Sequence, residues 1–429
     1  MRIRIEGRHP LRGIYRASGN SNAAIALIAA SMLSDAPITL HNVPDTIGVG
    51  VMLEVGTALG LKSEPPEVRD GQITLHTPNL IGRTVRREYA DALGGTLLFL
   101  APILARRRHV QVEIDYAVSR IHTHLTALRD LGIVVHVEGG TLTFSANTWD
   151  KREIILTQTS VTATTICAIL ATALGRETLI LNAASEPHVV DVLHLLAGMG
   201  AQIEGIGSNL LTVHGFGGAD MPSQPVVLAL SPDHIEIGSV AAMAALSGGK
   251  LTIQGGRQRD LRMISKVYER LGVTMQLDED EIFIPRHESA LTLSSRDEDV
   301  DASVESAPFP GFPSDLIGMA TLIATQARGT VLVHEKLFAN RLLFVDRLNS
   351  MGAQIVLCDP HRAIVIGNTP LRADYIDNPD VRIGLSMLGA ALIADGETVI
   401  DAAEAFDRSF EHVLDKLSAV GAHIRRVEG

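Results

Sequence analysis

Three arginines occupy matching positions near the end of the chain, in the phrases FANRLL, DVRIGL and FDRSFEH. They are Arg341, Arg382 and Arg408, and each is expected at the start of a helix that faces a loop. Arginine binds phosphate and carboxylate groups through paired N–H donors. One such arginine alone is usually a solvated surface charge, whereas three in parallel positions predict a common pocket for an anion.

A candidate catalytic carboxylate lies in the segment ESAPFPGFPSDLIG, residues 305–318. Asp315 follows three prolines and a glycine, which make a rigid turn, and it opens the next expected helix. A helix cap would by itself explain an aspartate at this place. Because a cap alone does not need a rigid proline-rich loop, we favour a further role in which Asp315 takes a proton from a hydroxyl group.

Two other loops lead into strongly apolar helices. The first is ASGNSNAA (17–24), with Ser18, Asn20, Ser21 and Asn22, and the second is QTSVTATTI (158–166), with Ser160, Thr162 and Thr165. Such residues cap helix N-termini, and the free N–H groups there also bind anions such as phosphate. For both loops the sequence leaves these two interpretations open.

Several other features suggest no chemistry. The run RRRH (106–109) is expected to be a solvated turn and Cys167 a small core residue, and neither Cys167 nor Cys358 is a confident nucleophile. The histidine and cysteine spacings indicate no zinc site, and no Walker or GxGxxG loop is present. We therefore expect neither a metal ion nor a cofactor.

Composition narrows the protein class. The chain has 429 residues, 46% of them hydrophobic, which suits two to four domains with large cores. The net charge of −12 argues against a general nucleic-acid-binding protein, and two cysteines exclude a disulfide scaffold.

The N-terminus MRIRIEGRHPLRG alternates like a strand, and no long apolar segment suggests a membrane span. The expected location is the cytoplasm, and the oligomeric state is not predicted.

An internal repeat organises the chain. Six copies combine an amphipathic helix, a glycine turn and an alternating strand, and the turn glycines lie about 70 residues apart, at Gly60, Gly132, Gly200, Gly272, Gly352 and Gly421. Nearly all-apolar helices, such as AAIALIAASML and TICAILATAL, lie between these copies. Helices that are apolar on all sides must be buried, and helices with a polar face must lie outside.

Six such units are too many for one core, so we predict an α/β protein of two lobes with three units each, in preference to a solenoid. The first lobe would comprise residues 21–231, and the second residues 1–20 and 232–429. The N-terminal strand would pair with the closing strand AHIRRVEG. A ligand cleft is expected between the lobes, because domain interfaces often provide one.

These phrases resemble the enolpyruvyl transferase family over essentially the whole chain. The likeness is carried by RIEGRHPLRGIYRASGNSNAA, SVTATT, NAASEPHVVDVLHLLAGMGAQIEGIG, PDHIEIGS, APFPGFPSD, ANR, DVR and FDRSFEHVLDKLSAVGAHIRRVEG. The resemblance implies a two-lobed inside-out α/β barrel. It also implies transfer of the enolpyruvyl group of phosphoenolpyruvate to a hydroxyl of UDP-N-acetylglucosamine, with release of phosphate, for peptidoglycan precursor synthesis.

The resemblance assigns roles to individual residues. Asp315 would act as the base on the acceptor hydroxyl, and Asp115, in EIDYAVSRIHTHL, would stand in for the general acid. Phosphoenolpyruvate would be bound by Asn22, Arg120, Arg341, Arg382 and Arg408. The nucleotide and acceptor would be bound by His124, Ser160, Val161 and Thr162.

The chain departs from the family pattern at several of these places. Ser21 stands where the family has a lysine, Gly94 where it usually has an arginine, and Thr165 where it usually has a glutamate. The loop that carries Asp115 is shortened. Two alternatives therefore stay open: the same chemistry on another acceptor, such as a nucleotide or a cyclic alcohol, and an inactive nucleotide-binding homologue.

Overall fold

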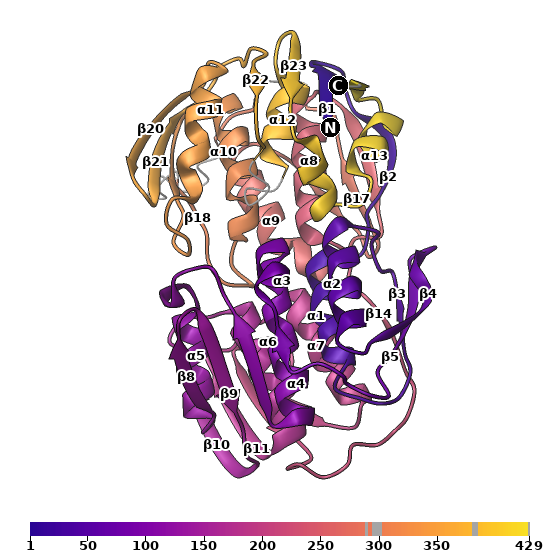
Figure 1. The fold of residues 1–429 in the computed structure, drawn as a ribbon. Coiled ribbons are helices and arrows are strands. Elements are labelled where there is room, and N and C mark those ends of the chain that lie inside the picture. Colours follow the sequence, from indigo (N-terminus) through magenta and orange to yellow (C-terminus); the bar gives the residue numbers. More distant parts are fainter. Residues whose placement is uncertain (288–290, 294–302, 380–384, 428–429) are drawn as a thin grey trace. The chain divides into compact units, whose positions relative to one another are not determined.

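The computed structural model describes residues 1–287, 291–293, 303–379 and 385–427. The chain forms two compact units, whose elements are labelled in Figure 1. Residues 19–231 form one of them, called here the central unit. Residues 1–18 and 232–429 form the other, called here the terminal unit. The expected boundary between residues 20 and 21 lies two residues from the boundary in the structure, between residues 18 and 19.

Each unit contains three four-stranded sheets. The orders are β14-β3-β5-β4, β6-β7-β9-β8 and β10-β11-β13-β12 in the central unit, and β16-β17-β15-β2, β18-β19-β21-β20 and β22-β23-β1-β24 in the terminal unit. In every sheet a parallel pair lies at one edge and two antiparallel pairs follow. This sixfold repetition matches the predicted sixfold repeat of the sequence.

The strands of the central unit are short. They are β3 (Ile38–His41), β4 (Lys62–Arg69), β5 (Gln72–His76), β6 (Thr84–Val85), β7 (His109–Glu113), β8 (Val134–Glu138), β9 (Thr141–Ser145), β10 (Trp149–Ile155), β11 (Gly175–Leu181), β12 (Gln202–Glu204), β13 (Leu210–His214) and β14 (Val226–Ala229). Along β3, β5, β7, β9 and β13, which are inner strands of the three sheets, buried residues alternate with half-buried or exposed ones, so one face of these strands covers the core.

The terminal unit has the same kind of strands. They are β1 (Arg2–Glu6), β2 (Arg12–Arg16), β15 (Lys250–Gln254), β16 (Gln276–Leu277), β17 (Glu281–Ile284), β18 (Ser303–Glu305), β19 (Thr330–His334), β20 (Gln354–Asp359), β21 (Arg362–Ile366), β22 (Tyr375–Ile376), β23 (Glu397–Ile400) and β24 (His423–Val427). β1 pairs with both β23 and β24. The predicted pairing of the N-terminal strand with the closing strand is therefore confirmed.

The apolar helices are buried, as predicted. They are α1 (Ser21–Ser31), α4 (Leu100–Arg107) and α6 (Val161–Leu174) in the central unit, and α8 (His234–Leu246), α10 (Ile317–Gln326) and α12 (Ser386–Ile393) in the terminal unit. In the terminal unit α8, α10 and α12 pack against one another, with Gly389 close to Leu322 and Met243. Alanine and glycine bring the helix backbones close together, because they leave little side-chain volume between them.

The amphipathic helices each end directly before one of the glycine turns predicted from the repeat. They are α2 (Ile47–Ala58), α5 (His122–Asp130) and α7 (Pro187–Gly198) in the central unit, and α9 (Gln258–Arg270), α11 (Val345–Ser350) and α13 (Val413–Ala419) in the terminal unit, with a further short helix, α3 (Arg87–Ala92). Helical turns of the 3₁₀ type include η1 (Gly94–Phe99), η2 (Val118–Ile121), η3 (Ser314–Leu316), η4 (Arg341–Phe344) and η6 (Ala403–Arg408). Within the described ranges, no helix has the length and apolar character needed to cross a membrane.

One expectation about the basic run 106–109 is wrong. Arg106 is half-buried, and its guanidinium donates to the carbonyl oxygens of Met32 (3.0 Å), Thr77 (2.8 Å) and Pro78 (3.2 Å). Burial lowers the pKa of Arg106. The last carbonyls of a helix lack partners within the helix, and Arg106 supplies a donor to one of these at the end of α1.

Candidate functional site

Asp315 lies in η3, directly before the buried helix α10. Its Oδ1 accepts a hydrogen bond from Nη2 of Arg341 at 2.6 Å. The carboxylate side chain is 46% exposed, whereas the arginine side chain is only 13% exposed. The rigid turn thus presents an accessible carboxylate on a mostly buried guanidinium. Asp315 caps neither η3 nor α10, whose N-cap residues are Pro313 and Leu316.

Arg341 is in turn fixed by the neighbouring loop. Its Nη1 contacts Oγ of Ser314, and its guanidinium carbon lies 4.8 Å from the centre of the Phe338 ring. Ser314 donates to Oε2 of Glu335 at 2.6 Å. A continuous chain of polar contacts therefore runs from Glu335 through Ser314 and Arg341 to Asp315.

Glu335 lies at the buried end of this series of polar contacts, and the sequence analysis did not select it. Its side chain is fully buried, and its Oε1 accepts from the backbone N–H groups of Leu337 (2.9 Å) and Phe338 (3.1 Å). A buried carboxylate is stable only when hydrogen bonds replace its water. Glu335 therefore orders the loop that leads to Arg341, whereas in the sequence it looks like an ordinary charge at a strand end.

Of the two other predicted arginines, only Arg408 lies among the described residues, and no contact described there joins it to this series. Arg408 is exposed and is the last residue of η6, so the expectation that it starts a helix is wrong. Arg382 lies outside the described residues. Arg341 does occupy the first position of a helical turn, as predicted, because it opens η4.

A second polar cluster lies at the start of α8. Asp233 caps this helix, since its Oδ1 accepts from the N–H groups of Ile235 (2.9 Å) and Glu236 (3.3 Å). Glu236 is itself buried and accepts from the Tyr15 hydroxyl at 2.6 Å. Burial, followed by the charges of Glu236 and Asp315, raises the pKa of Asp233 from 3.8 to about 7.

Asp233 is expected to make the protein less stable as the pH rises from about 4 to about 7. In this window the native carboxyl keeps a proton that the unfolded chain has lost. The stability from the protonated carboxyl is therefore complete below about pH 4 and is lost as the pH passes about 7. Asp233→Asn keeps the capping oxygen but cannot titrate, so its Tm should fall less between about pH 5 and about 7 than that of the wild type.

The matched control for this measurement is Asp278→Asn. Asp278 is exposed and also accepts a backbone N–H, from Glu279 at 2.9 Å. Its replacement should leave the pH dependence of Tm as in the wild type. The same pH slope in the wild type and in Asp233→Asn would contradict the prediction.

Lys416 of α13 connects this cluster to the loop 17–24. Its Nζ lies 3.1 Å from Oε1 of Glu236 and 3.7 Å from Oε2 of Glu411, and it contacts Oγ of Ser18. Ser18 also donates to Glu411. Lys416 therefore places a positive charge at Ser18, near the start of the loop 17–24, and this charge is paired with Glu236 and Glu411. Sequence reasoning missed Lys416, because it lies 398 residues from Ser18.

In the same loop, Asn20 is the residue that caps α1. Its Oδ1 accepts from the N–H of Ala23 at 3.0 Å. Ser21, at the lysine position of the family, is buried and lies 3.1 Å from the hydroxyl of Thr46, which caps α2. The Ser21 hydroxyl therefore has a protein partner, and Asn22 is exposed.

Gly19 is held where no side chain fits. A Cβ at this position would lie 1.7 Å from the carbonyl oxygen of Asn42. Asn42 also donates from its side chain to the carbonyl oxygen of Leu230 at 3.1 Å. The tight approach fixes the backbone immediately before the capping Asn20.

The loop 158–166 also contains a capped helix start. Ser160 accepts from the N–H of Ala163 at 3.3 Å and so caps α6, while Val161 and Thr162 are half-exposed in the first turn. Thr165 is buried and donates to the carbonyl oxygen of Val161 at 2.9 Å. The cap interpretation is thus confirmed for Ser160, and Thr165 bonds within its own helix.

The residues predicted in the shortened loop lie in three different settings. Asp115 is exposed and accepts from Arg87, a residue that the sequence analysis did not select. Arg120 is exposed in η2. His124 lies on α5, and neither of its buried ring nitrogens has a hydrogen-bond partner among the described residues. Burial lowers the pKa of His124 to about 4, so its ring is neutral near pH 7.

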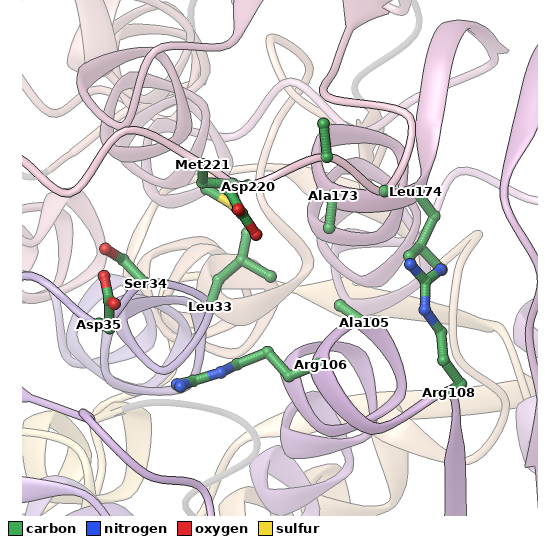
Figure 2. Close-up of a pocket in the computed structure, with 12 residues that line it drawn as sticks. Leu33, Ser34, Asp35, Ala105, Arg106, Arg108, Ala173, Leu174, Asp220 and Met221 are labelled. Atoms are coloured by element: carbon green, nitrogen blue, oxygen red, sulfur yellow. The ribbon is translucent and has the colours of Figure 1, made fainter.

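A cavity of about 330 Å³ lies elsewhere in the central unit (Figure 2). It is lined by residues that end or follow α1, α4 and α6, among them Ser34, Arg106 and Leu174. Asp35 and Asp220 also line it, so the acidic and basic side chains balance. None of the predicted site residues lines this cavity.

Comparisons with known proteins place the chain in one family. Residues 5–417 match the family described as EPSP synthase (3-phosphoshikimate 1-carboxyvinyltransferase). A UDP-N-acetylglucosamine 1-carboxyvinyltransferase of Treponema pallidum is 38% identical over 427 residues, which cover 98% of both chains. A protein of the same name from Bradyrhizobium diazoefficiens is 36% identical and covers 99% of this chain and 97% of its own.

Solved structures share the fold. The enolpyruvyl transferase NikO from Streptomyces tendae has a TM-score of 0.87 at 21% identity, covering 99% of this chain and 98% of its own. An EPSP synthase from Acinetobacter baumannii has a TM-score of 0.73 at 15% identity, covering both chains completely. These structures confirm the predicted fold class, and the sequence matches show that the chain belongs to the enolpyruvyl transferase family of enzymes.

Proposed function

We propose that the protein transfers the enolpyruvyl group of phosphoenolpyruvate to a hydroxyl of UDP-N-acetylglucosamine and releases phosphate, a step in peptidoglycan precursor synthesis. The observation that carries this proposal is the set of relatives named UDP-N-acetylglucosamine 1-carboxyvinyltransferase, 32–38% identical over nearly the whole chain. The cytoplasm, expected from the N-terminal sequence and the two cysteines, is part of the proposal.

In this proposal the terminal unit supplies the base. Asp315 accepts the proton of the acceptor hydroxyl as the hydroxyl oxygen bonds to the carbon that carries the phosphate oxygen, while a general acid gives a proton to the neighbouring methylene carbon. Loss of a proton from that carbon then restores the double bond as the bond to the phosphate oxygen breaks and phosphate leaves. The exposed Asp315 carboxylate on the mostly buried Arg341 supports this role, because the arginine orients the base. Arg341, with Arg382 and Arg408, would bind the anionic phosphoenolpyruvate, since preorganised cations stabilise charge that develops in the transition state.

The central unit would bind the acceptor and nucleotide. Ser160, Val161 and Thr162 form the half-exposed first turn of α6, where free N–H groups favour a phosphate group. The neutral His124 ring, with two unpartnered nitrogens, suits an uncharged hydroxyl or amide of the sugar better than a phosphate. Asn22 and Arg120, both exposed, would contact phosphoenolpyruvate.

The general acid is the least supported part of this assignment. Asp115 would have to part from Arg87 before it could donate a proton. Ser21 and Gly94 bring no charge to the positions where the family has a lysine and an arginine. These changes fit the different-acceptor alternative, and the loss of the lysine favours the inactive homologue, so the experimental test includes both.

The test measures inorganic phosphate after the purified protein is mixed with phosphoenolpyruvate and UDP-N-acetylglucosamine. We expect phosphate release that requires both substrates and is matched by the carboxyvinyl product. One control omits the UDP-sugar, and another replaces it with 3-phosphoshikimate. Release with 3-phosphoshikimate alone would overturn the proposed acceptor, and no release with either would favour another acceptor or an inactive homologue.

A further inference from the structure

Two histidines and a glutamate meet at one edge of the sheet β22-β23-β1-β24. Glu6 ends β1 and His423 begins β24, and the two residues are directly opposite in the antiparallel pair. His9 follows Glu6 by three residues, in the turn between β1 and β2. The three side chains therefore come from both ends of the chain, which explains why no spacing in the sequence reveals them.

Their atoms lie close enough to share a metal ion. Oε1 of Glu6 is 3.5 Å from Nε2 of His9, and Oε2 of Glu6 is 3.5 Å from Nδ1 of His423. All three ligand atoms lie within 4.8 Å of one another. Zn–ligand bonds of 2.0–2.1 Å in a tetrahedron separate neighbouring ligand atoms by roughly 3.3 Å. Each histidine nitrogen is at a comparable 3.5 Å from one Glu6 oxygen, Oε1 for His9 and Oε2 for His423, so the carboxylate either binds through both oxygens or turns to offer one of them.

The backbone directly before His9 is already ordered. The N–H of Gly7 donates to the carbonyl oxygen of Gly396 at 3.0 Å, and that of Arg8 donates to Leu392 at 2.9 Å. A Cβ on Gly7 would lie 1.9 Å from the carbonyl oxygen of Ala394, so the turn packs tightly on the chain beneath it. An ordered backbone lowers the entropy cost of bringing ligands together.

The chemistry of the three groups selects the metal. Imidazole nitrogens with one carboxylate favour zinc and its transition-metal neighbours over calcium or magnesium, which prefer oxygen ligands alone. A charged carboxylate and neutral imidazoles are the states that bind a metal ion.

We propose that Glu6, His9 and His423 form a Zn²⁺ site that fastens the turn after β1 to the start of β24. The two imidazole rings are now stacked, with centres 3.5 Å apart and planes inclined by 11°. To direct a nitrogen lone pair of each ring at one ion, the rings must turn out of this stack. Three protein ligands leave a fourth position for water, as in open zinc sites.

The test uses the full chain with Cys358→Ser, which removes the exposed thiol as a competing ligand. After removal of metals with a chelator, Zn²⁺ binding is measured by calorimetry, and Co²⁺ serves as a visible reporter of coordination. We expect one Zn²⁺ per chain, a tetrahedral Co²⁺ spectrum and a higher Tm with Zn²⁺. His9→Asn and His423→Asn should each weaken binding roughly 100-fold, since even a residue that only supports a ligand costs 10–100-fold.

A matched control comes from a pair that lacks a third ligand. His214 Nε2 lies 4.0 Å from Oε1 of Glu204, and in the described part of the chain this pair belongs to no three-residue cluster. His214→Asn should bind Zn²⁺ as the parent does. The proposal is overturned if His9→Asn and His423→Asn bind Zn²⁺ as tightly as the parent, or if the Co²⁺ spectrum of the parent is that of the hydrated ion.

Discussion

Replacing Asp315 with asparagine is expected to lower the rate of enolpyruvyl transfer by about 100- to 10,000-fold, the usual contribution of a general base. Asparagine keeps the shape of the side chain and still accepts a hydrogen bond from Arg341, but it cannot take a proton from the acceptor. The KM values should therefore change little. Steady-state phosphate release at saturating substrates measures the effect.

A second aspartate–arginine pair in the terminal unit provides the control. Asp377 accepts from Arg347 at 2.5 Å, and its side chain is 58% exposed, comparable to that of Asp315. Asp377→Asn should leave the rate unchanged. An Asp315→Asn enzyme that retains the wild-type kcat would remove Asp315 from the role of base.

Replacing Arg341 with lysine should raise the KM for phosphoenolpyruvate by about 30-fold, because the paired contact of a mostly buried guanidinium with the substrate anion is lost, at a cost of about 2 kcal/mol. Lysine keeps the positive charge but has no planar fork. It cannot contact Ser314 and Asp315 through two fixed nitrogens as the guanidinium does. A lower kcat should accompany the change, because Asp315 loses the group that orients it.

Initial rates at varied phosphoenolpyruvate, with UDP-N-acetylglucosamine saturating, separate the two constants. Arg347→Lys is the matched substitution, since Arg347 is an exposed arginine with an aspartate partner in the same unit. It should behave as the wild type. An unchanged KM and kcat in Arg341→Lys would show that charge alone suffices at this position.

The fold could be predicted because the same physical pattern recurs six times. Helices such as α8, which are apolar on all sides, have to be buried, and the amphipathic helices with their glycine turns have to cover them. β1 could be assigned to the end of the chain because the closing strand lacked a partner. These inferences depend on periodicity, which is a local property of a sequence.

The contacts of the site could not be predicted in the same way, because they join residues that are far apart in the chain. Asp315 and Arg341 could be selected by residue type, but the anchor Glu335 has no local signature. Lys416 meets Ser18 only after both ends of the chain have come together. The basic run 106–109 was misjudged because the sequence does not reveal the carbonyl groups that Arg106 meets at the end of α1.

The pairing of β1 with β23 and β24 also sets an order of events during synthesis. The first strand leaves the ribosome long before residues 397–400 and 423–427 exist. At about 5–20 residues per second, β1 waits roughly 20–80 s for its neighbours. The central unit is continuous in sequence, so it can fold on the nascent chain while the amino-terminal strands are still unpaired. β2 can pair with β15 as soon as residues 250–254 exist, whereas β1 keeps both edges unsatisfied throughout this interval and is exposed to wrong strand pairing for the longest time.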